Sequence, residues 1–388
     1  MKKPSPCILG LIAFRKSQMD SWEQPKENSI AAMQHGMEFS DGVEFDLRID
    51  GDGELVIYHD EFVPGQGPIR DRCIERLPTS NLRDYGISTF REILNNRTFT
   101  DLWQGGGKTV DIEFKVPHPV NKLDTDEYLS SMMDLLEQGL GSFDLPIRST
   151  LVCSFSPRIG PVANSKGFGI PVTRLMPRIR AWGRYWKVKR MVAMPHFART
   201  SVRSIARTVR RDGMESMGIA LEYLTGWTRW INPGPPVGLH GRGLERLNEI
   251  RRGMGLFVWP CPLKHEDALL GAGVSIVSDH MDPDVVERPN GSPRWPRPAS
   301  QPLDDEWRTR LQGVSTEELS DLMKEASKSL PNWSELDSGR RASIVKEQGH
   351  RLQWPGSEEK WTNDGDGGIP WGSPRIIGHR GAGKTHSG

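Results

Sequence analysis

The stretch Gly42–Asp60, GVEFDLRIDGDGELVIYHD, decides the fold because it combines a buried strand with acidic side chains. Glu44 and Asp46 are two residues apart, so on a strand both side chains point to the same face. Apolar neighbours around them indicate that this face is the inside of a barrel. Two carboxylates at a strand end make a site for a hard cation such as Mg²⁺ or Ca²⁺. An ordinary strand with a solvated acidic face is the alternative.

Two further segments add polar groups at the same kind of position. His59 follows the apolar run ELVIY and is expected to project into the same mouth. In TVDIEFKV, Glu113 and Lys115 repeat the spacing of two residues. Glu113 would complete a metal site of three carboxylates, and Lys115 could neutralise a phosphate. A structural salt bridge is the other interpretation of this pair.

Apolar runs alternate with helix-like segments from residue 7 to about 280, which predicts an α/β fold, a (β/α)₈ TIM barrel. Several runs are apolar throughout, as expected for parallel strands that are buried on both faces. The expected strands are 7–14, 42–49, 54–59, 109–116, 149–155, 171–176, 216–222, 255–260 and 273–278. Nine candidates exceed eight strands, and 54–59 is the candidate for an extra hairpin.

The chain is expected to contain four parts. The barrel spans 5–288, a Pro-rich linker 289–302 and a helical spacer 303–372, and residues 373–388 contain a further strand-like motif. In the spacer, Ser315 and Glu318 have the spacing of a capping box.

Composition indicates a soluble, cytoplasmic protein. The net charge is +1, from 51 basic and 50 acidic residues, which excludes a global field directed at nucleic acid. The four cysteines form no CxxC pair, which argues against zinc and disulfides and fits a reducing compartment. The N-terminal apolar run, 7–14, is not expected to be a signal peptide. It is short, ends before Arg15 and Lys16, and lacks a cleavage site.

Taken in order, six segments resemble the glycerophosphodiester phosphodiesterase family of TIM-barrel hydrolases. They are KENSIAAM (26–33), GVEFDLRIDGDGELVIYHD (42–60), DIEFK (111–115), CSFSP (153–157), GLFVWP (255–260) and GVSIVSDHMD (273–282). The resemblance covers residues 5–285. It implies metal-dependent hydrolysis of glycerophosphodiesters to glycerol phosphate and an alcohol, in glycerophospholipid metabolism, with Mg²⁺ or Ca²⁺ as cofactor.

The resemblance also implies roles for single residues. Glu44, Asp46 and Glu113 would hold the metal, and His59 would be one of two catalytic histidines. Lys115 would contact phosphate, and Trp259 would form a wall of the glycerol pocket. The two histidines would share proton transfer, one accepting from the nucleophile and one donating to the leaving alcohol.

The family's first histidine and an arginine belong to a His-Arg-Gly motif at the end of the first strand. This chain has SPCILGLIAFRK (5–16) there, and SPRIIGHRGAGK (373–384) near its C-terminus. Aligned without a gap, five of the twelve positions are identical, and His379 and Arg380 align with Leu11 and Ile12. The first copy has lost the catalytic pair and the second has kept it.

Two arrangements follow from this repeat. In the preferred one the chain is tandem: 7–14 is the first strand of a degenerate barrel, and 373–388 begins a second copy. In the other, the C-terminal strand docks on the first barrel, displaces 7–14, and supplies His379 and Arg380 as catalytic groups.

These arrangements allow two functions. The chain is a phosphodiesterase, with doubtful activity in the first domain alone. Alternatively, it is a catalytically degenerate barrel that binds metal or phosphodiester and supports an active second domain.

Residues 178–211 form a basic stretch with interleaved aromatic residues and no acidic ones. Arg199, Arg203, Arg207 and Arg210 recur at helical spacing, so they would share one face. A solvated basic helix is one interpretation, and adsorption to an anionic membrane surface, with peripheral localisation, is another. Nucleic acid is a third partner class, but no recognisable binding module accompanies the stretch.

Overall fold

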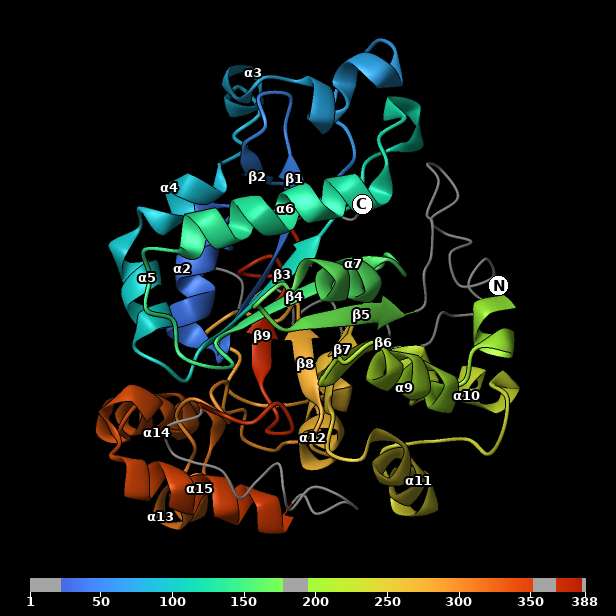
Figure 1. Cartoon of the computed structure of the whole chain (residues 1–388). Coiled ribbons are helices and arrows are strands. Elements are labelled where there is room, and N and C mark those ends of the chain that lie inside the picture. The colour runs from blue at the N-terminus through green and yellow to red at the C-terminus, as the bar shows by residue number, and fades with distance from the viewer. Residues whose placement is uncertain (1–21, 177–194, 352–367, 386–388) are drawn as a thin grey trace, which may run out of the picture.

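A closed barrel of eight parallel strands forms the centre of the molecule, which is a computed structural model that describes residues 22–176, 195–351 and 368–385 (Figure 1). Neighbouring strands pair in the order β1, β3, β4, β5, β6, β7, β8, β9, and β9 pairs again with β1. The strands are β1 (Gly42–Ile49), β3 (Thr109–Phe114), β4 (Thr150–Ser154), β5 (Val172–Met176), β6 (Ser216–Ala220), β7 (Gly255–Trp259), β8 (Ser275–Ser278) and β9 (Ile376–Gly378). The predicted TIM barrel is therefore confirmed.

The strands are buried on both faces, which explains why they are apolar runs in the sequence. Every residue of β3, β4, β6 and β8 is buried. Inward side chains fill the barrel and outward ones pack under the surrounding helices. The barrel and these helices share one hydrophobic core, to which Phe45, Ile112 and Ile276 belong.

The surplus strand of the sequence prediction is a hairpin extension. β2 (Leu55–Ile57) pairs antiparallel with the end of β1, with Leu47 opposite Ile57. The backbone N–H of Tyr58 then donates to the carbonyl of Asp46 at 3.1 Å. The hairpin therefore returns the chain towards the carboxyl end of β1, where His59 follows.

Helices surround the barrel. α2 begins after Ser29, whose hydroxyl caps the helix by accepting from the backbone N–H of Ala32. The helices around the barrel are α2 (Ile30–Phe39), α3 (Thr79–Arg83), α4 (Phe90–Leu94), α5 (Arg97–Gln104), α6 (Thr125–Leu140), α7 (Ile159–Lys166), α9 (Val202–Arg211), α10 (Thr228–Ile231), α11 (Gly241–Arg251) and α12 (Leu263–Gly271). Within the described ranges, no helix is long and apolar enough to span a bilayer.

The C-terminal strand β9 closes the barrel between β8 and β1. Ile376, Ile377 and Gly378 pair with β8, and Gly378 also pairs with Val43 of β1. The expected strand 7–14 lies outside the described residues. The position between β8 and β1 that the preferred arrangement gave to 7–14 is occupied by β9, which agrees with the docking expected in the second arrangement. A three-residue strand suffices because hydrogen bonds on both sides hold it.

Residues before β9 bind it firmly to the amino end of the barrel. The Arg375 guanidinium is fully buried and donates to the hydroxyl of Thr109 and to the carbonyls of Ile369, Pro370 and Ser373, at 2.6–3.0 Å. The backbone N–H of Ile376 donates to the carboxylate of Asp41 at 2.9 Å. These contacts fix the register of the short strand.

The Pro-rich segment 289–302 connects the barrel to the C-terminal helices, and polar contacts attach it to the barrel. The Arg294 side chain is fully buried, and it binds the buried carboxylate of Glu266 in α12 at 3.0 Å. Further on, the backbone N–H of Ser300 donates to Asp41 at 2.7 Å. Polar contacts, which leave no hydrophobic period in the sequence, therefore hold this segment against the barrel.

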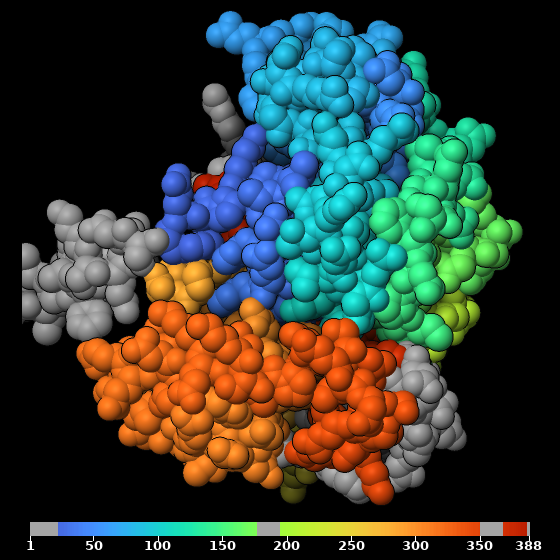
Figure 2. Space-filling model, turned by 90° about the vertical axis from the view of Figure 1, so that its left-hand side faces the viewer, coloured from blue at the N-terminus to red at the C-terminus, as the bar shows by residue number. Residues whose placement is uncertain are grey.

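The helical spacer forms a layer at the amino end of the barrel, shown in orange in Figure 2. It contains α13 (Asp305–Arg310), α14 (Thr316–Ser329) and α15 (Ser338–Arg351). α14 begins with the predicted capping box of Ser315 and Glu318. The buried Trp333, which precedes α15, packs against Gly107 just before β3. This layer carries the chain to the position from which β9 enters the barrel.

Candidate active site

Three buried carboxylates meet at the carboxyl end of the barrel. Glu44 and Asp46 lie on β1 and Glu113 on β3, and the strand register places Asp46 directly opposite Glu113. One oxygen of each carboxylate lies within 4.8 Å of the others. The spacing of two residues along β1 and the parallel register of β1 and β3 together explain the convergence. The structure thus brings together the three residues that the sequence assigned to a metal.

Crowding of negative charge dominates the electrostatics of this group. Burial, reinforced by the charges of Asp46 and Glu113, raises the pKa of Glu44 well above its ordinary value. Burial also acts to raise the pKa of Asp46, but Lys115, His59 and Arg380 outweigh it and hold that pKa well below its ordinary value. Without a further cation, Asp46 is therefore ionised more readily than Glu44.

Two cationic side chains partly compensate for the crowding. The Lys115 ammonium lies 2.8 Å from Asp46 and 2.5 Å from Glu113. The Arg380 guanidinium lies 3.5 Å from the Asp46 carboxylate. Arg380 follows β9, which pairs with β1 on the side opposite to β3. Lys115 therefore contacts two of the proposed metal ligands directly, as the salt-bridge interpretation expected.

His379 lies beside Glu44 and is held by an aspartate. Its Nε2 is 3.8 Å from the Glu44 carboxylate, and its Nδ1 is 2.7 Å from the carboxylate of Asp279, just after β8. Burial lowers the pKa of His379 although Asp279 opposes this shift. A neutral imidazole that donates Nδ1–H to Asp279 presents an Nε2 lone pair to the carboxylate group.

His59 is oriented in the same way. Its Nδ1 lies 2.7 Å from the carboxylate of Asp60. Burial, and then the charge of Lys115, lower the pKa of His59 to about 3, while Asp46 acts in the opposite direction. Each of the two histidines thus has a carboxylate at Nδ1, which leaves Nε2 as the nitrogen available for proton transfer.

Arg380 is held in position by two residues to which the sequence analysis assigned no role. Its guanidinium lies 2.5 Å from the carboxylate of Glu27, and its carbonyl accepts from the backbone N–H of Asn28 at 3.0 Å. The Asn28 amide donates to Asp46 at 2.9 Å. Arg380 and Asn28 both have positive φ, at 50° and 57°. Residues with such φ values cluster at functional sites.

Gly381, the third residue of the His-Arg-Gly motif, explains why the motif ends in glycine. Its φ is +88°, and a Cβ there would come within 2.5 Å of the backbone of Ala32 in α2. The close approach lets the backbone N–H of Gly381 bond to the carbonyl of Glu44 at 3.1 Å. The loop after β9 therefore fits only with glycine at this position.

Trp259 stands at the end of β7, where the sequence predicted a wall of the site. It is half-buried, and its ring meets Phe155 edge-on, with 5.4 Å between the centroids. Gly218 of β6 leaves room for the indole, because a Cβ there would lie 3.3 Å from it. The two rings form an apolar surface at the carboxyl end of the barrel.

The missed residues Glu27, Asn28 and Asp279 lie inside segments that carry the family resemblance. Glu27 and Asn28 directly precede the cap of α2, and Asp279 directly follows β8. Asp279 could have been predicted as a site residue because it directly follows a predicted barrel strand, and active sites of such barrels lie at the carboxyl ends of the strands.

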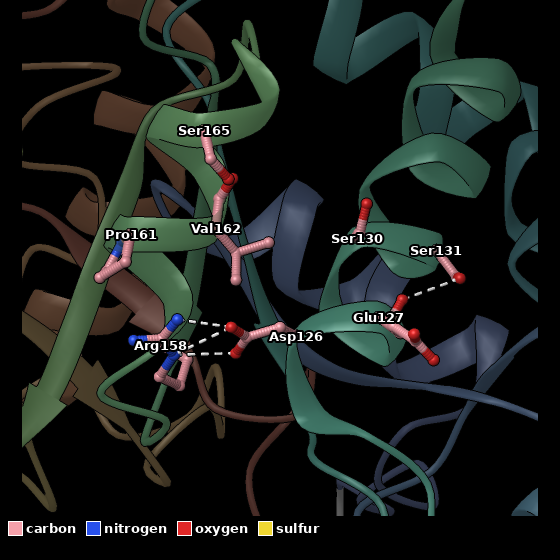
Figure 3. A pocket seen from close by; sticks show the side chains of 8 residues that line it. All are labelled: Asp126, Glu127, Ser130, Ser131, Arg158, Pro161, Val162 and Ser165. Carbon is pink, nitrogen blue, oxygen red and sulfur yellow. Dashed lines mark hydrogen bonds and ion pairs between the residues drawn. The ribbon is translucent and has the colours of Figure 1, made fainter.

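A hollow on the outer surface is separate from this site. An open groove of about 520 Å³ lies between α6 and α7 (Figure 3). The ion pair of Arg158 with Asp126, at 2.5 Å, crosses its edge. None of the residues at the carboxyl end of the barrel discussed above lines it.

Comparison with known proteins gives one curated relative and several solved structures. A glycerophosphodiester phosphodiesterase of Caldanaerobacter subterraneus subsp. tengcongensis is 41% identical over 56 residues, which are 13% of this chain. The match spans 23% of that relative's length. Glycerophosphodiester phosphodiesterases from Thermotoga maritima and Parabacteroides distasonis align with TM-scores of 0.42 and 0.44, at 16% and 17% identity. They cover 66% and 67% of this chain, and the alignment covers 88% of each.

The sequence model of one family matches slightly more than half of the chain, over residues 16–215. The matched part includes β1, β3 and the three carboxylates, whereas β9 and its histidine lie outside it. The chain belongs to the glycerophosphoryl diester phosphodiesterase family.

Proposed function

We propose that this protein hydrolyses glycerophosphodiesters to glycerol phosphate and an alcohol in a metal-dependent reaction of glycerophospholipid metabolism. The observation that carries the proposal is the convergence of Glu44, Asp46 and Glu113 with a histidine on an anchored Nδ1, His379, at one end of the barrel. Family membership supports the substrate class, and the geometry of the site supports the proposed chemistry.

The three carboxylates suit a divalent cation. Oxygen ligands are those that Mg²⁺ and Ca²⁺ prefer, and three of them lie within 4.8 Å of one another. The raised pKa of Glu44, caused by burial and by its two acidic neighbours, fits a group that needs positive charge between its members. A bound cation would polarise a phosphoryl oxygen and offset negative charge that develops in the transition state.

His379 and His59 are suited to move protons. With Nδ1–H donated to an aspartate, each neutral imidazole offers Nε2 as a base. One histidine would accept the proton of the attacking hydroxyl at Nε2. The other would first take up a proton from solvent at Nε2, and would then give that proton to the leaving alkoxide. Asp279 and Asp60 are positioning residues in this scheme, because they fix the tautomer and orientation of the rings.

Lys115 and Arg380 would bind the phosphate. Both carry positive charge beside the carboxylates, and burial does not prevent this, because the pKa of each is raised by neighbouring acids despite desolvation. Trp259, with Phe155, would place an apolar wall against the carbon skeleton of glycerol. These groups would orient the diester so that the two histidines reach its oxygens.

The alternative of a degenerate barrel rested on Leu11 and Ile12 at the positions of the catalytic pair. The docking of β9 supports the active alternative, because His379 and Arg380 contact the carboxylates of the same barrel. On this proposal the C-terminal motif completes the barrel's own site.

Turnover of glycerophosphocholine by the full chain, measured as release of glycerol phosphate, tests the proposal. We expect activity with Mg²⁺ or Ca²⁺ that chelation abolishes and fresh cation restores. His379→Ala should lower kcat by roughly 10²- to 10⁴-fold, the usual value of one acid–base group. His240→Ala, at an exposed residue before α11, is the matched control. Full activity in the folded His379→Ala variant would refute a catalytic role for the docked motif.

A further inference from the structure

Exposed tryptophan and arginine side chains gather on α9, on α10 and in the segment before α9. We call this surface the Trp–Arg patch, and it comprises Trp227, Trp230, Arg199, Arg203 and Arg207. α9 and α10 lie side by side in Figure 1. The catalytic scheme proposed above uses none of these residues.

The two tryptophans are unusually accessible for their size. Each is 65% exposed, although a tryptophan side chain normally buries most of its surface. They are three residues apart across the single turn of α10, so both leave from the same side. The Arg229 guanidinium lies 5.1 Å from the ring centroid of Trp230, which adds a cation beside the indoles.

α9 presents a basic face to solvent. Val202, Ile205 and Val209 point into the core, whereas Arg203 and Arg207, one turn apart, are exposed. Arg199 is also exposed, but it precedes α9, whose N-cap Ser201 is in an extended conformation. The prediction that Arg199 shares one helical face with the arginines of α9 is therefore wrong. Residues 195–211 contain five arginines and no acidic residue. Within the described part of the chain, Arg199, Arg203 and Arg207 form no salt bridge.

Hydrogen bonds join the two halves of the patch into one surface. The Asn232 amide, just after α10, donates to the carbonyls of Phe197 and Thr200 at 2.9 Å each. The Phe197 ring packs against Tyr223, with 4.6 Å between the centroids. These contacts hold the end of α10 against the segment before α9.

The patch lies at the same end of the barrel as the candidate active site. Arg199 belongs to the segment between β5 and α9, and α10 belongs to the segment between β6 and α11. Segments that follow barrel strands leave from the carboxyl end, where the carboxylates converge. We propose that the Trp–Arg patch docks the protein on an anionic phospholipid surface, with the mouth of the barrel directed towards the membrane.

The chemistry of the patch favours a bilayer as the partner. Tryptophan is enriched at the membrane interface because its amphipathic ring suits the headgroup region. Each arginine near an anionic leaflet strengthens binding by roughly fivefold. Stacking of nucleotide bases would use the same side chains, but both indoles project from one side of a short helix rather than lining a groove. Binding to RNA is therefore an outcome of the test, not the proposal.

Flotation with vesicles tests docking without any measurement of catalysis. The full chain is mixed with vesicles of phosphatidylcholine alone or with added phosphatidylserine. We expect binding to the mixed vesicles and at least roughly tenfold weaker binding to phosphatidylcholine, with loss at high salt. Arg203→Glu with Arg207→Glu should weaken binding by at least roughly tenfold. Trp227→Ala with Trp230→Ala should also weaken it, by roughly tenfold.

Matched controls lie on other surfaces. Lys324→Glu with Lys328→Glu reverses two exposed charges on α14, and Tyr85→Ala removes an aromatic ring that is 43% exposed. Both should leave vesicle binding unchanged. Equal binding to both kinds of vesicle, binding that neither patch variant weakens, or capture of single-stranded RNA without vesicle binding would each overturn the proposal. Because the readout is binding, its failure would leave the proposed hydrolysis untouched.

Discussion

Two buried carboxylates, Asp41 and Glu44, lie three residues apart in the chain but face opposite ends of the barrel, and their neighbours act on their pKa values in opposite ways. At the amino end, Asp41 accepts from the backbone N–H groups of Ala299, Ser300 and Ile376 and from the Ser300 hydroxyl, at 2.7–3.2 Å. Burial raises the pKa of Asp41, whereas the hydrogen bonds from Ser300 and Ile376 and the charge of Lys108 lower it. Asp41 is a carboxylate whose charge is satisfied by fixed donors, so its role is structural.

Glu44 lies three residues further along the chain and belongs to the group of carboxylates at the carboxyl end of the barrel, where its neighbours are acidic. Asp46 and Glu113 reinforce the effect of burial on its pKa instead of opposing it. A stable fold gains nothing from such crowding, and the crowding therefore supports our proposal that this group binds a cation or substrate. The comparison teaches that burial of a carboxylate does not identify a functional site, whereas unsatisfied like charges do.

The largest effect is expected from a substitution at the carboxyl end. Glu44→Gln keeps an oxygen that can accept from the backbone N–H of Arg380, now 2.9 Å away, but removes one ligand charge. We expect kcat/KM to fall by roughly 10³-fold, since electrostatic stabilisation by a metal site contributes several kcal/mol. The melting temperature should stay the same or rise, because a like charge is removed.

Glu127→Gln, at an exposed residue of α6, is the control for surface charge. A Glu44→Gln variant that keeps its activity but melts at a lower temperature would reverse the comparison. It would make the carboxyl-end group structural as well.

The amino end should show the opposite pattern. Asp41→Ala leaves three backbone N–H groups and a hydroxyl without their acceptor, and should lower the free energy of unfolding by about 3 kcal/mol. The remaining folded protein should keep its kcat. Urea unfolding and turnover on the same preparations check both statements, with the exposed Asp101→Ala of α5 as control. Unchanged stability would mean that the contacts of Asp41 do not hold the C-terminal segment.

A third substitution probes the positioning of His379. Asp279→Asn keeps the size of the side chain but allows the histidine to take its other tautomer. We expect kcat to fall on the order of 10²-fold with little change in KM, as for other residues that orient a functional histidine. Asp279→Glu should restore part of the rate. Equal losses in both variants together with a lower melting temperature would indicate a structural role instead.

Much of the barrel was predictable from the sequence, because its strands are short apolar runs. The spacing of Glu44 and Asp46 also identified one face of β1, and it led to Glu113. In a parallel barrel, the register of β1 and β3 then places Glu113 beside Asp46, so these three carboxylates could be predicted to converge once the fold class was known.

The closing strand was harder to predict, because two segments of similar sequence compete for one position. Which of 7–14 and 376–378 pairs with β8 depends on contacts far apart in the chain. The hydrogen bond of Arg380 with Glu27 joins residues 353 positions apart, and that of His379 with Asp279 joins residues 100 positions apart. The attachment of segment 289–302 to the barrel could not be predicted for a related reason, because backbone donors that bind Asp41 produce no periodicity.

The smallest effect concerns the pH dependence of stability at the amino end. Burial, with the charge of Arg297, lowers the pKa of Lys108 to about 7, although Asp41 opposes this shift. In the unfolded chain the pKa is near the ordinary value of 10.5, so between these values the unfolded state binds more protons. Below pH 7 the folded protein therefore bears the full cost of burying a charged Lys108 ammonium, and the free energy of unfolding rises with pH until about 10.5.

Lys108→Met should remove this dependence while preserving the length of the side chain. We expect the slope of unfolding free energy against pH to be about 1 kcal/mol per pH unit lower in the variant between pH 8 and pH 10. Asp41 and Arg297 are present in both proteins, so the difference between the slopes isolates Lys108. The control is Lys328→Met on the exposed side of α14, whose slope should match that of the parent. Equal slopes in all three proteins would show that Lys108 is as freely protonated when folded as when unfolded, and that the amino end is less completely buried than its contacts imply.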